Sequence, residues 1–230
     1  MSPIIAHIRL TRPANIVTAI ADILAGAAIS GAVFHLIQDM DPAISKSIAW
    51  LVLSTIGLYG GGVAFNDVFD AELDRVERPE RPIPSGQASV KSAGIMAFLL
   101  LLVGVLAAWQ VSAFSAGIAL SVALLAVLYD AWGKHQNIFG PINMGLCRAG
   151  NLLLGMSLME GAVQNYWYIG LIPLLYVAAI TMVSRGEVHG QNILALKSGL
   201  VIYAVIVGFI FLLAYTNIEN WWESLPFLAL

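Results

Sequence analysis

Seven long apolar segments run through this chain of 230 residues, and they limit what it can fold into. Each is close to the roughly 20 residues that an α-helix needs to cross the hydrocarbon core of a bilayer. Backbone N–H and C=O groups in lipid must find partners within the protein, which favours helices over irregular structure. We therefore expect an all-α, polytopic transmembrane helical bundle. The segments are 14–36, 44–66, 91–111, 113–132, 140–160, 166–184 and 197–217.

The composition agrees with a membrane protein. Hydrophobic residues make up 59% of the chain and charged residues 11%, whereas soluble domains carry roughly 25% charged residues. We expect neither a soluble domain nor a nucleic-acid partner. A further apolar run at 221–230 is too short to cross the bilayer. The expectation is one domain over 1–230 with seven complete spans and an incomplete eighth, which fits either a chain truncated at its C-terminus or one that ends on an interfacial stub.

The basic residues are sorted to one side of this seven-span arrangement. Only Lys46 falls on the other side. Because Lys and Arg are enriched in cytoplasmic loops, we expect the N-terminus and the loop after the second span to face the cytoplasm, as in a multi-pass protein of the bacterial inner membrane. The residues on the shared side are Arg9, Arg12, Arg75, Arg78, Arg81, Lys91, Lys134, Arg185 and Lys197.

A run of acidic residues follows the second apolar segment. On a continuous helix, Asn66, Asp67, Asp70 and Asp74 would share one face. Carboxylates held together repel one another unless a cation neutralises them, and Mg²⁺ is commonly bound by a few carboxylates together with substrate phosphates. The run therefore predicts a Mg²⁺ site. The alternative is a solvated acidic helix cap.

The residues of this region resemble a known family. The stretch NDVFDAELDRVERPERPIPSG, with an earlier RPAN at 12–15, is similar to the UbiA superfamily of intramembrane prenyltransferases, whose signature is N-D-x-x-D-x-x-x-D followed by R-P-x-R-P-I-P-S-G. The resemblance implies a helical bundle, nine spans in the family pattern, around a cavity open to lipid. It also implies Mg²⁺-dependent transfer of an isoprenyl group from an isoprenyl diphosphate to a lipophilic, commonly aromatic, acceptor, with membrane lipid as a further partner.

The resemblance also implies roles for individual residues. Cleaving an allylic diphosphate is slow unless cations stabilise the oxygens on which charge develops. On this basis Asp67, Asp70 and Asp74 are expected to be catalytic. The expected metal ligands are Asn66, Asp67, Asp70, Asp74 and Glu187. The expected substrate-binding residues are Asn15, Arg75, Arg81, Tyr129, Lys134, Arg148, Arg185 and His189.

The second acidic motif that the family carries after the sixth span is altered here. The segment reads SRGEVHGQN at 184–192, and Glu187 is its one acidic residue. One interpretation is an enzyme in which Arg185 and His189 contact the diphosphate where a second metal would otherwise lie. Another is a UbiA-like protein that binds a prenyl diphosphate or another lipid-linked anion without transferring it. With CRAGNLLLGMS at 147–157, this segment resembles the EboC-like branch.

Two ionisable residues fall inside predicted spans. Asp22 lies in the first and Arg148 in the fifth, and groups at that depth usually face a cavity or each other. We expect either a structural pair or residues that line the interior. A third interpretation of the whole chain, a proton-coupled transporter, would use Asp22 with Glu187 and His189.

Overall fold

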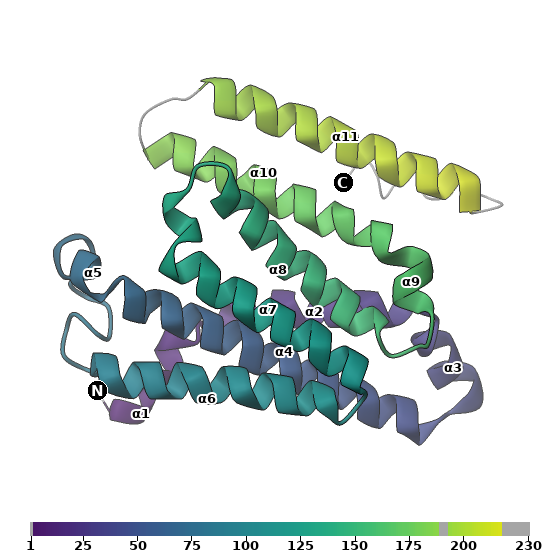
Figure 1. Cartoon of the computed structure of the whole chain (residues 1–230), viewed down its shortest axis with the longest axis horizontal. Helices are drawn as coiled ribbons and strands as arrows, with labels where there is room; N and C mark the ends of the chain where they lie inside the picture. Colours follow the sequence, from purple (N-terminus) through teal and green to yellow (C-terminus); the bar gives the residue numbers. More distant parts are fainter. Residues whose placement is uncertain (1, 189–192, 218–230) are drawn as a thin grey trace.

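Helices are the only regular secondary structure in the described part of the chain. The computed structural model describes the backbone of residues 2–188 and 193–217 and the side chains of 2–184 and 196–216. Within these ranges there is no strand, which confirms the all-α prediction (Figure 1). The helices are α1 (Pro3–Leu10), α2 (Pro13–Ile29), α3 (Ala32–Asp39), α4 (Pro42–Phe69), α5 (Ala71–Glu77), α6 (Val90–Trp109), α7 (Ala113–Ala131), η1 (Gly133–His135), α8 (Phe139–Met156), α9 (Ala162–Tyr166), η2 (Trp167–Gly170), α10 (Leu171–Val188) and α11 (Ile193–Asn217).

Short polar side chains start several of the long helices. Asp41 accepts a hydrogen bond from the backbone N–H of Ala43 at 2.8 Å, directly before α4. Ser89 accepts one from the third residue of α6, and Ser112 does the same for α7. Such caps satisfy backbone donors that have no partner within the helix. The chain therefore turns at defined points between apolar segments.

Five helical stretches are long and apolar enough to cross a membrane. They are α4, α6, α7, the stretch Ala162–Ser184 and most of α11. The pair α1 and α2, bent by 43°, would make a sixth. The more polar α8 is not among them, because Asn143, Arg148 and Asn151 lower its hydropathy. Each of the seven predicted segments overlaps a helix, but the number of seven crossings stays a prediction.

The first predicted span differs from the structure at its end. The segment 14–36 was expected to form one helix, whereas α2 stops at Ile29 and α3 begins at Ala32. Gly31 causes the break, since its φ of 83° lies in the left-handed region that glycine adopts without steric cost. The apolar run at 221–230 lies outside the described residues.

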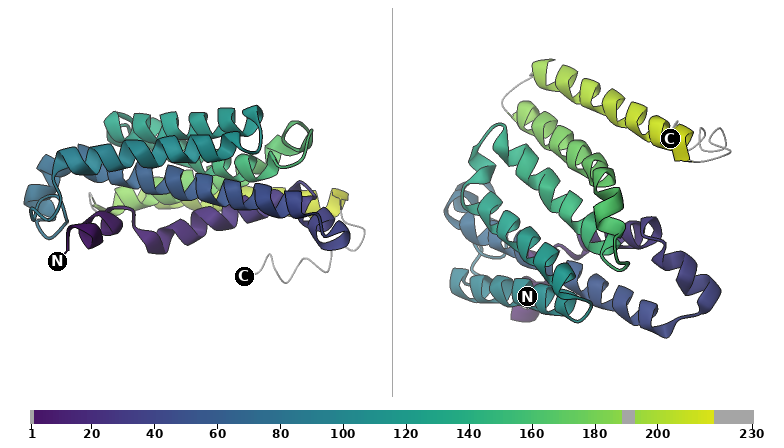
Figure 2. Two further views of the ribbon diagram at one scale, coloured as in Figure 1. Left: turned by 90° about the horizontal axis from the view of Figure 1, so that it is seen from below. Right: turned by 45° about the vertical axis from the view of Figure 1, so that its right-hand side comes forward.

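The helices surround a small interior and present apolar side chains outward. In the side view of Figure 2, α1 and α2 form one face of the bundle and α6 and α7 the other. The core between them contains Ile23, Leu58, Val122 and Leu154. Large apolar side chains such as Phe98 are exposed on the outer faces. With the long apolar helices, these faces identify an integral membrane protein.

The charged connections gather at one end of the bundle. Figure 1 shows α1, α5 and the start of α6 at this end, and α3 and α9 at the opposite end. The basic residues at 9, 12, 75, 78, 81 and 91 belong to the first of these ends, and Lys46 lies near the start of α4, at the other. The predicted sorting of positive charge is thus present in the fold.

Candidate functional site

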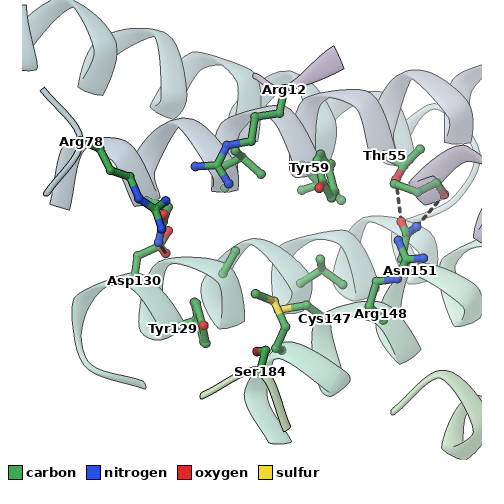
Figure 3. A pocket seen from close by; sticks show the side chains of 18 residues that line it. Arg12, Thr55, Tyr59, Arg78, Tyr129, Asp130, Cys147, Arg148, Asn151 and Ser184 are labelled. Atoms are coloured by element: carbon green, nitrogen blue, oxygen red, sulfur yellow. Dashed lines mark hydrogen bonds between the residues drawn. The ribbon is translucent and has the colours of Figure 1, made fainter. Parts of the chain in front are cut away.

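A cavity of about 600 Å³ lies between α2, α4, α7, α8 and α10 (Figure 3). This volume is in the range of small-molecule sites. Figure 3 shows Arg12, Arg78 and Asp130 at one end of it, and Thr55, Arg148 and Asn151 at the other. The wall between the two ends is mostly apolar, with Leu58, Val63, Val122, Ala126 and Met144 among its residues.

The length of the cavity follows from α4, which runs along it. Thr55 and Asn66 of this helix line opposite ends, and a rise of 1.5 Å per residue over eleven positions separates them by about 16 Å. The end at Asn66 coincides with the basic end of the bundle. The site is therefore elongated, charged at one end and apolar along its middle.

The acidic motif is split between two helices. The single helix expected over 66–74 is interrupted at Asp70, since α4 ends at Phe69 and α5 begins at Ala71. Arg81, from the proline-rich loop, nevertheless joins two of its acids: Nη1 is 3.2 Å from Asp67 Oδ1 and 2.6 Å from Asp74 Oδ2. Both carboxylates are buried. One guanidinium thus compensates two carboxylates.

Further cations reach the motif from distant parts of the chain. Arg12 donates to Asp67 Oδ1 at 2.7 Å. It does so from the bend between α1 and α2, where its φ of 46° is unusual for a residue with a side chain. Lys134, after α7, donates to Asp70 Oδ1. Lys134 was expected to bind substrate; in the structure it pairs with the motif and is not part of the described cavity wall, and its contact with a diphosphate stays a prediction.

The donor set fits Mg²⁺ in chemistry but is not gathered around one point. Among the described side chains, no three acidic, histidine or cysteine residues form a metal-holding group. The reason is that Asp67, Asp70 and Asp74 each face a cationic side chain. Mg²⁺ takes hard oxygen ligands and is commonly held by only one or two carboxylates, with waters and substrate phosphates completing the shell. The metal site at the motif stays a prediction.

Two predicted substrate-binding residues line the cavity. Tyr129 does so at the end of α7, and Arg148 from α8. Arg148 thus lines the interior and also forms the expected pair with Asp22, since its Nη1 lies 3.0 Å from Asp22 Oδ2. Asn151 donates to Asp22 at 3.2 Å and accepts from Thr55 at 2.7 Å, so α2, α4 and α8 are tied by one polar network.

Two other predicted residues do not reach the cavity. Arg75 is exposed on α5 and pairs with Glu72 at 2.9 Å, because the turn at Asp70 directs this face of α5 outward. Asn15 is exposed on α2, one turn after Arg12, and is not part of the cavity wall. Neither position supports direct contact with a ligand in this cavity.

The altered second motif falls outside what the structure describes. The side chains of Arg185 and Glu187 and the whole of His189 lie outside the described residues. Ser184, the last described side chain of α10, lines the cavity. The predicted roles of the other three residues stay predictions.

Sequence reasoning missed three charged residues of the cavity. Arg12 and Arg78 were interpreted by their place among the basic residues, and Asp130 was not considered. Asp130 lies in the last turn of α7, is 4% exposed, and accepts a hydrogen bond from Asn66 Nδ2 at 2.9 Å. An acid inside an apolar segment beside Tyr129 was the available signal.

Comparison with known proteins gives consistent matches. A sequence model of the UbiA prenyltransferase family matches residues 20–230. The digeranylgeranylglyceryl phosphate synthase of Methanosarcina mazei is 30% identical over 178 residues, which are 74% of this chain and 61% of the relative. That of Ignicoccus hospitalis is 30% identical over 186 residues, 80% of this chain and 58% of the relative. The chain thus spans about three fifths of the length of these relatives.

A solved structure shares the fold. It is that of a UbiA homolog from Archaeoglobus fulgidus bound to DMAPP and Mg²⁺, and it superposes with a TM-score of 0.75 at 19% sequence identity. The match covers 96% of this chain and 82% of that one. The helical architecture is therefore the same.

Proposed function

The chain belongs to the UbiA prenyltransferase family, and from this premise we propose that it is a Mg²⁺-dependent intramembrane prenyltransferase. It binds an isoprenyl diphosphate and transfers the isoprenyl group to a lipophilic acceptor. The cavity carries this proposal, since a charged end and an apolar middle suit a molecule with an anionic head and a hydrocarbon tail. The related structure from Archaeoglobus fulgidus binds such a molecule, DMAPP, with Mg²⁺.

The charged end is where the diphosphate is proposed to bind. Arg12 and Arg78 line it, and guanidinium groups match the paired oxygens of phosphates in geometry and charge. Asn66, Asp67 and Asp70 are the proposed Mg²⁺ ligands. The metal supplies positive charge that stabilises the departing diphosphate. Arg81, which bridges Asp67 and Asp74, positions the motif instead of contacting substrate.

The apolar middle of the cavity is proposed to hold the isoprenyl chain. Leu58, Val63 and Val122 offer no hydrogen-bonding groups from their side chains. Such walls exclude water, which would otherwise compete with the acceptor for the reacting carbon. We propose that the lipophilic acceptor enters from the surrounding lipid. The expectation from the sequence is that this acceptor is aromatic.

The orientation in the membrane is also a proposal. The basic end of the bundle, with the N-terminus and the acidic motif, faces the cytoplasm, which the sorting of Lys and Arg supports. The relatives named above are archaeal. The bacterial inner membrane, expected from the sequence, stays a proposal about the source of this chain.

Titration of purified protein in lipid nanodiscs with geranylgeranyl diphosphate tests this function. Binding and pyrophosphate release are followed with and without Mg²⁺, in the presence of candidate acceptors. We expect both signals to require Mg²⁺ and Asp67→Asn to abolish them. The control Asp39→Asn changes an exposed acid at the opposite end of the bundle and is expected to leave both signals unchanged. Failure of the wild-type protein to bind the diphosphate would refute the proposal.

A second candidate function is binding without transfer. Segment 184–192 contains one acidic residue where the family motif carries two, which favours a protein with fewer fixed charges for metals. Mg²⁺-dependent binding with no pyrophosphate release for any acceptor supports this candidate over the enzyme. Proton-coupled transport, which would use Asp22, becomes the leading function only if the diphosphate does not bind at all.

A further inference from the structure

The described wall of the cavity contains one carboxylate, Asp130. It projects from the last turn of α7, where its residue is 4% exposed. The amide of Asn66, on α4, donates to its Oδ1 at 2.9 Å. Asn66 also lines the cavity, so an acid and an amide from two helices meet at its charged end.

Asp130 differs from the motif acids in how its charge is compensated. Asp67, Asp70 and Asp74 each have a cationic nitrogen within 3.2 Å. For Asp130, no Lys or Arg nitrogen of a described side chain lies within the 4.0 Å that defines an ion pair. Lys134 acts on Asp130 only from beyond ion-pair distance, because its ammonium pairs with Asp70. A buried carboxylate without a direct ion pair is costly. A cation bound in the cavity would remove that cost.

The place of Asp130 suits a ligand that also contacts phosphate. Arg12 and Arg78 line the same end of the cavity. A divalent cation held by Asp130 would lie beside these guanidinium groups, and its remaining ligands would be water and phosphate oxygens. The side-chain carbonyl of Asn66 is a second hard oxygen donor at this point.

We propose that Asp130, together with Asn66, ligates the divalent cation needed for isoprenyl diphosphate binding, and so supplies from α7 a fixed charge that segment 184–192 lacks. This inference rests on the proposed function and specifies its metal site. It assigns to one residue outside the N-D-x-x-D motif a direct role in cation binding.

Mn²⁺ provides a readout that does not depend on turnover. Protein in nanodiscs is titrated with Mn²⁺ in the presence of a non-cleavable geranylgeranyl thiolodiphosphate, and electron paramagnetic resonance measures the free ion. We expect Asp130→Asn, which keeps the size and the Asn66 contact, to weaken Mn²⁺ binding by about tenfold or more. Asp130→Glu retains a carboxylate and should lose less. The control Glu72→Gln alters an exposed acid of α5 and should bind as wild type does.

A second measurement uses the wild-type protein and so does not depend on how a variant folds. Fe²⁺ replaces Mg²⁺, and ascorbate with hydrogen peroxide generates radicals that cleave the backbone near the bound ion. Cleavage products ending around 129–131, detected by mass spectrometry together with cleavage near 66, are expected. Cleavage confined to 66–75 would contradict a role for Asp130.

The outcomes separate this inference from the proposed function. If the wild-type protein binds Mn²⁺ with the diphosphate analogue but Asp130→Asn binds equally well, the inference is wrong and the proposed function stands. The same holds if Asp130→Asn keeps Mn²⁺ binding and loses only transfer, since Asp130 would then act on protons. If the wild-type protein binds neither ligand, the proposed function itself fails.

Discussion

Arg81 links the two ends of the acidic motif at the scale of single residues. Its side chain is 17% exposed, and the carboxylates that it joins, Asp67 and Asp74, are 6% and 5% exposed. Arg12 also contacts Asp67, but Asp74 has Arg81 as its one ion-pair partner among the described residues. The motif geometry therefore depends on a residue from the proline-rich loop.

Replacing Arg81 should destabilise the fold. Arg81→Gln leaves Asp74 buried without a countercharge, and removal of one partner of a buried pair costs on the order of 3 kcal/mol. Unfolding in mixed micelles titrated with dodecyl sulfate measures this loss. The matched control Arg75→Gln breaks an exposed pair with Glu72, so its stability should change by less than about 1 kcal/mol. If Arg81→Gln lowered the stability no more than Arg75→Gln does, Arg81 would not have this structural role.

The sequence predicted individual residues unevenly, and the reason is physical. Arg81 and Lys134 were expected to contact the diphosphate, and the structure shows both of them paired with acids of the motif. Arg75 was expected to bind substrate, but the turn at Asp70 sends it to the surface. Asp130 was missed because its partner, Asn66, lies 64 residues away on another helix. Contacts between helices are set by packing, which a one-dimensional pattern does not contain.

At the scale of helices, α2 and α8 pack closely against each other beside the cavity. Small residues let them approach: a methyl group on Gly155 would overlap the carbonyl oxygen of Ile23, and one on Gly26 would overlap that of Leu152. The approach allows Asn151 to donate to the carbonyl of Ala19 at 2.8 Å. Close helix contact in membranes commonly depends on such residues.

Enlarging Gly155 should separate these helices. Gly155→Ala is expected to cost on the order of 2 kcal/mol through overpacking, and to weaken diphosphate binding because the cavity wall shifts. Thermal unfolding in nanodiscs, followed by tryptophan fluorescence, measures the first effect. In Gly117→Ala the added methyl group meets no atom within 4 Å. This control should therefore be as stable as the wild-type protein, or more stable by up to about 1 kcal/mol. An unchanged Gly155→Ala protein would contradict close packing here.

Helix existence was predictable from the sequence, whereas helix ends were less so. Apolar length alone located all the long helices. The break at Gly31 and the interruption at Asp70 were missed, since a hydrophobic average extends across single residues that change backbone direction. In α8, the polar residues Asn143, Arg148 and Asn151 lower the mean hydropathy by which a membrane span is identified.

At the scale of the whole molecule, the charged end of the cavity coincides with the basic end of the bundle. Arg12, Asn66 and Asp130 lie where α2 begins and where α4 and α7 approach their ends. The fold thus places the proposed diphosphate site near one membrane surface and the polar network at Arg148 about 16 Å further along the cavity. A water-soluble diphosphate head and a lipid-soluble tail could then each stay close to its own phase.

The orientation of this bundle can be tested by labelling. In a Cys147→Ala background, which removes the single cysteine, Glu80→Cys places a thiol in the exposed loop at the basic end and Gln164→Cys places one on α9 at the opposite end. A membrane-impermeant maleimide should label the first thiol only in inside-out vesicles and the second only in intact cells, because positively charged loops remain in the cytoplasm. The reverse pattern would place the diphosphate site on the outer surface, where the cell supplies little prenyl diphosphate, and would count against a biosynthetic role. Labelling of both thiols from one side would contradict the arrangement of the helices itself.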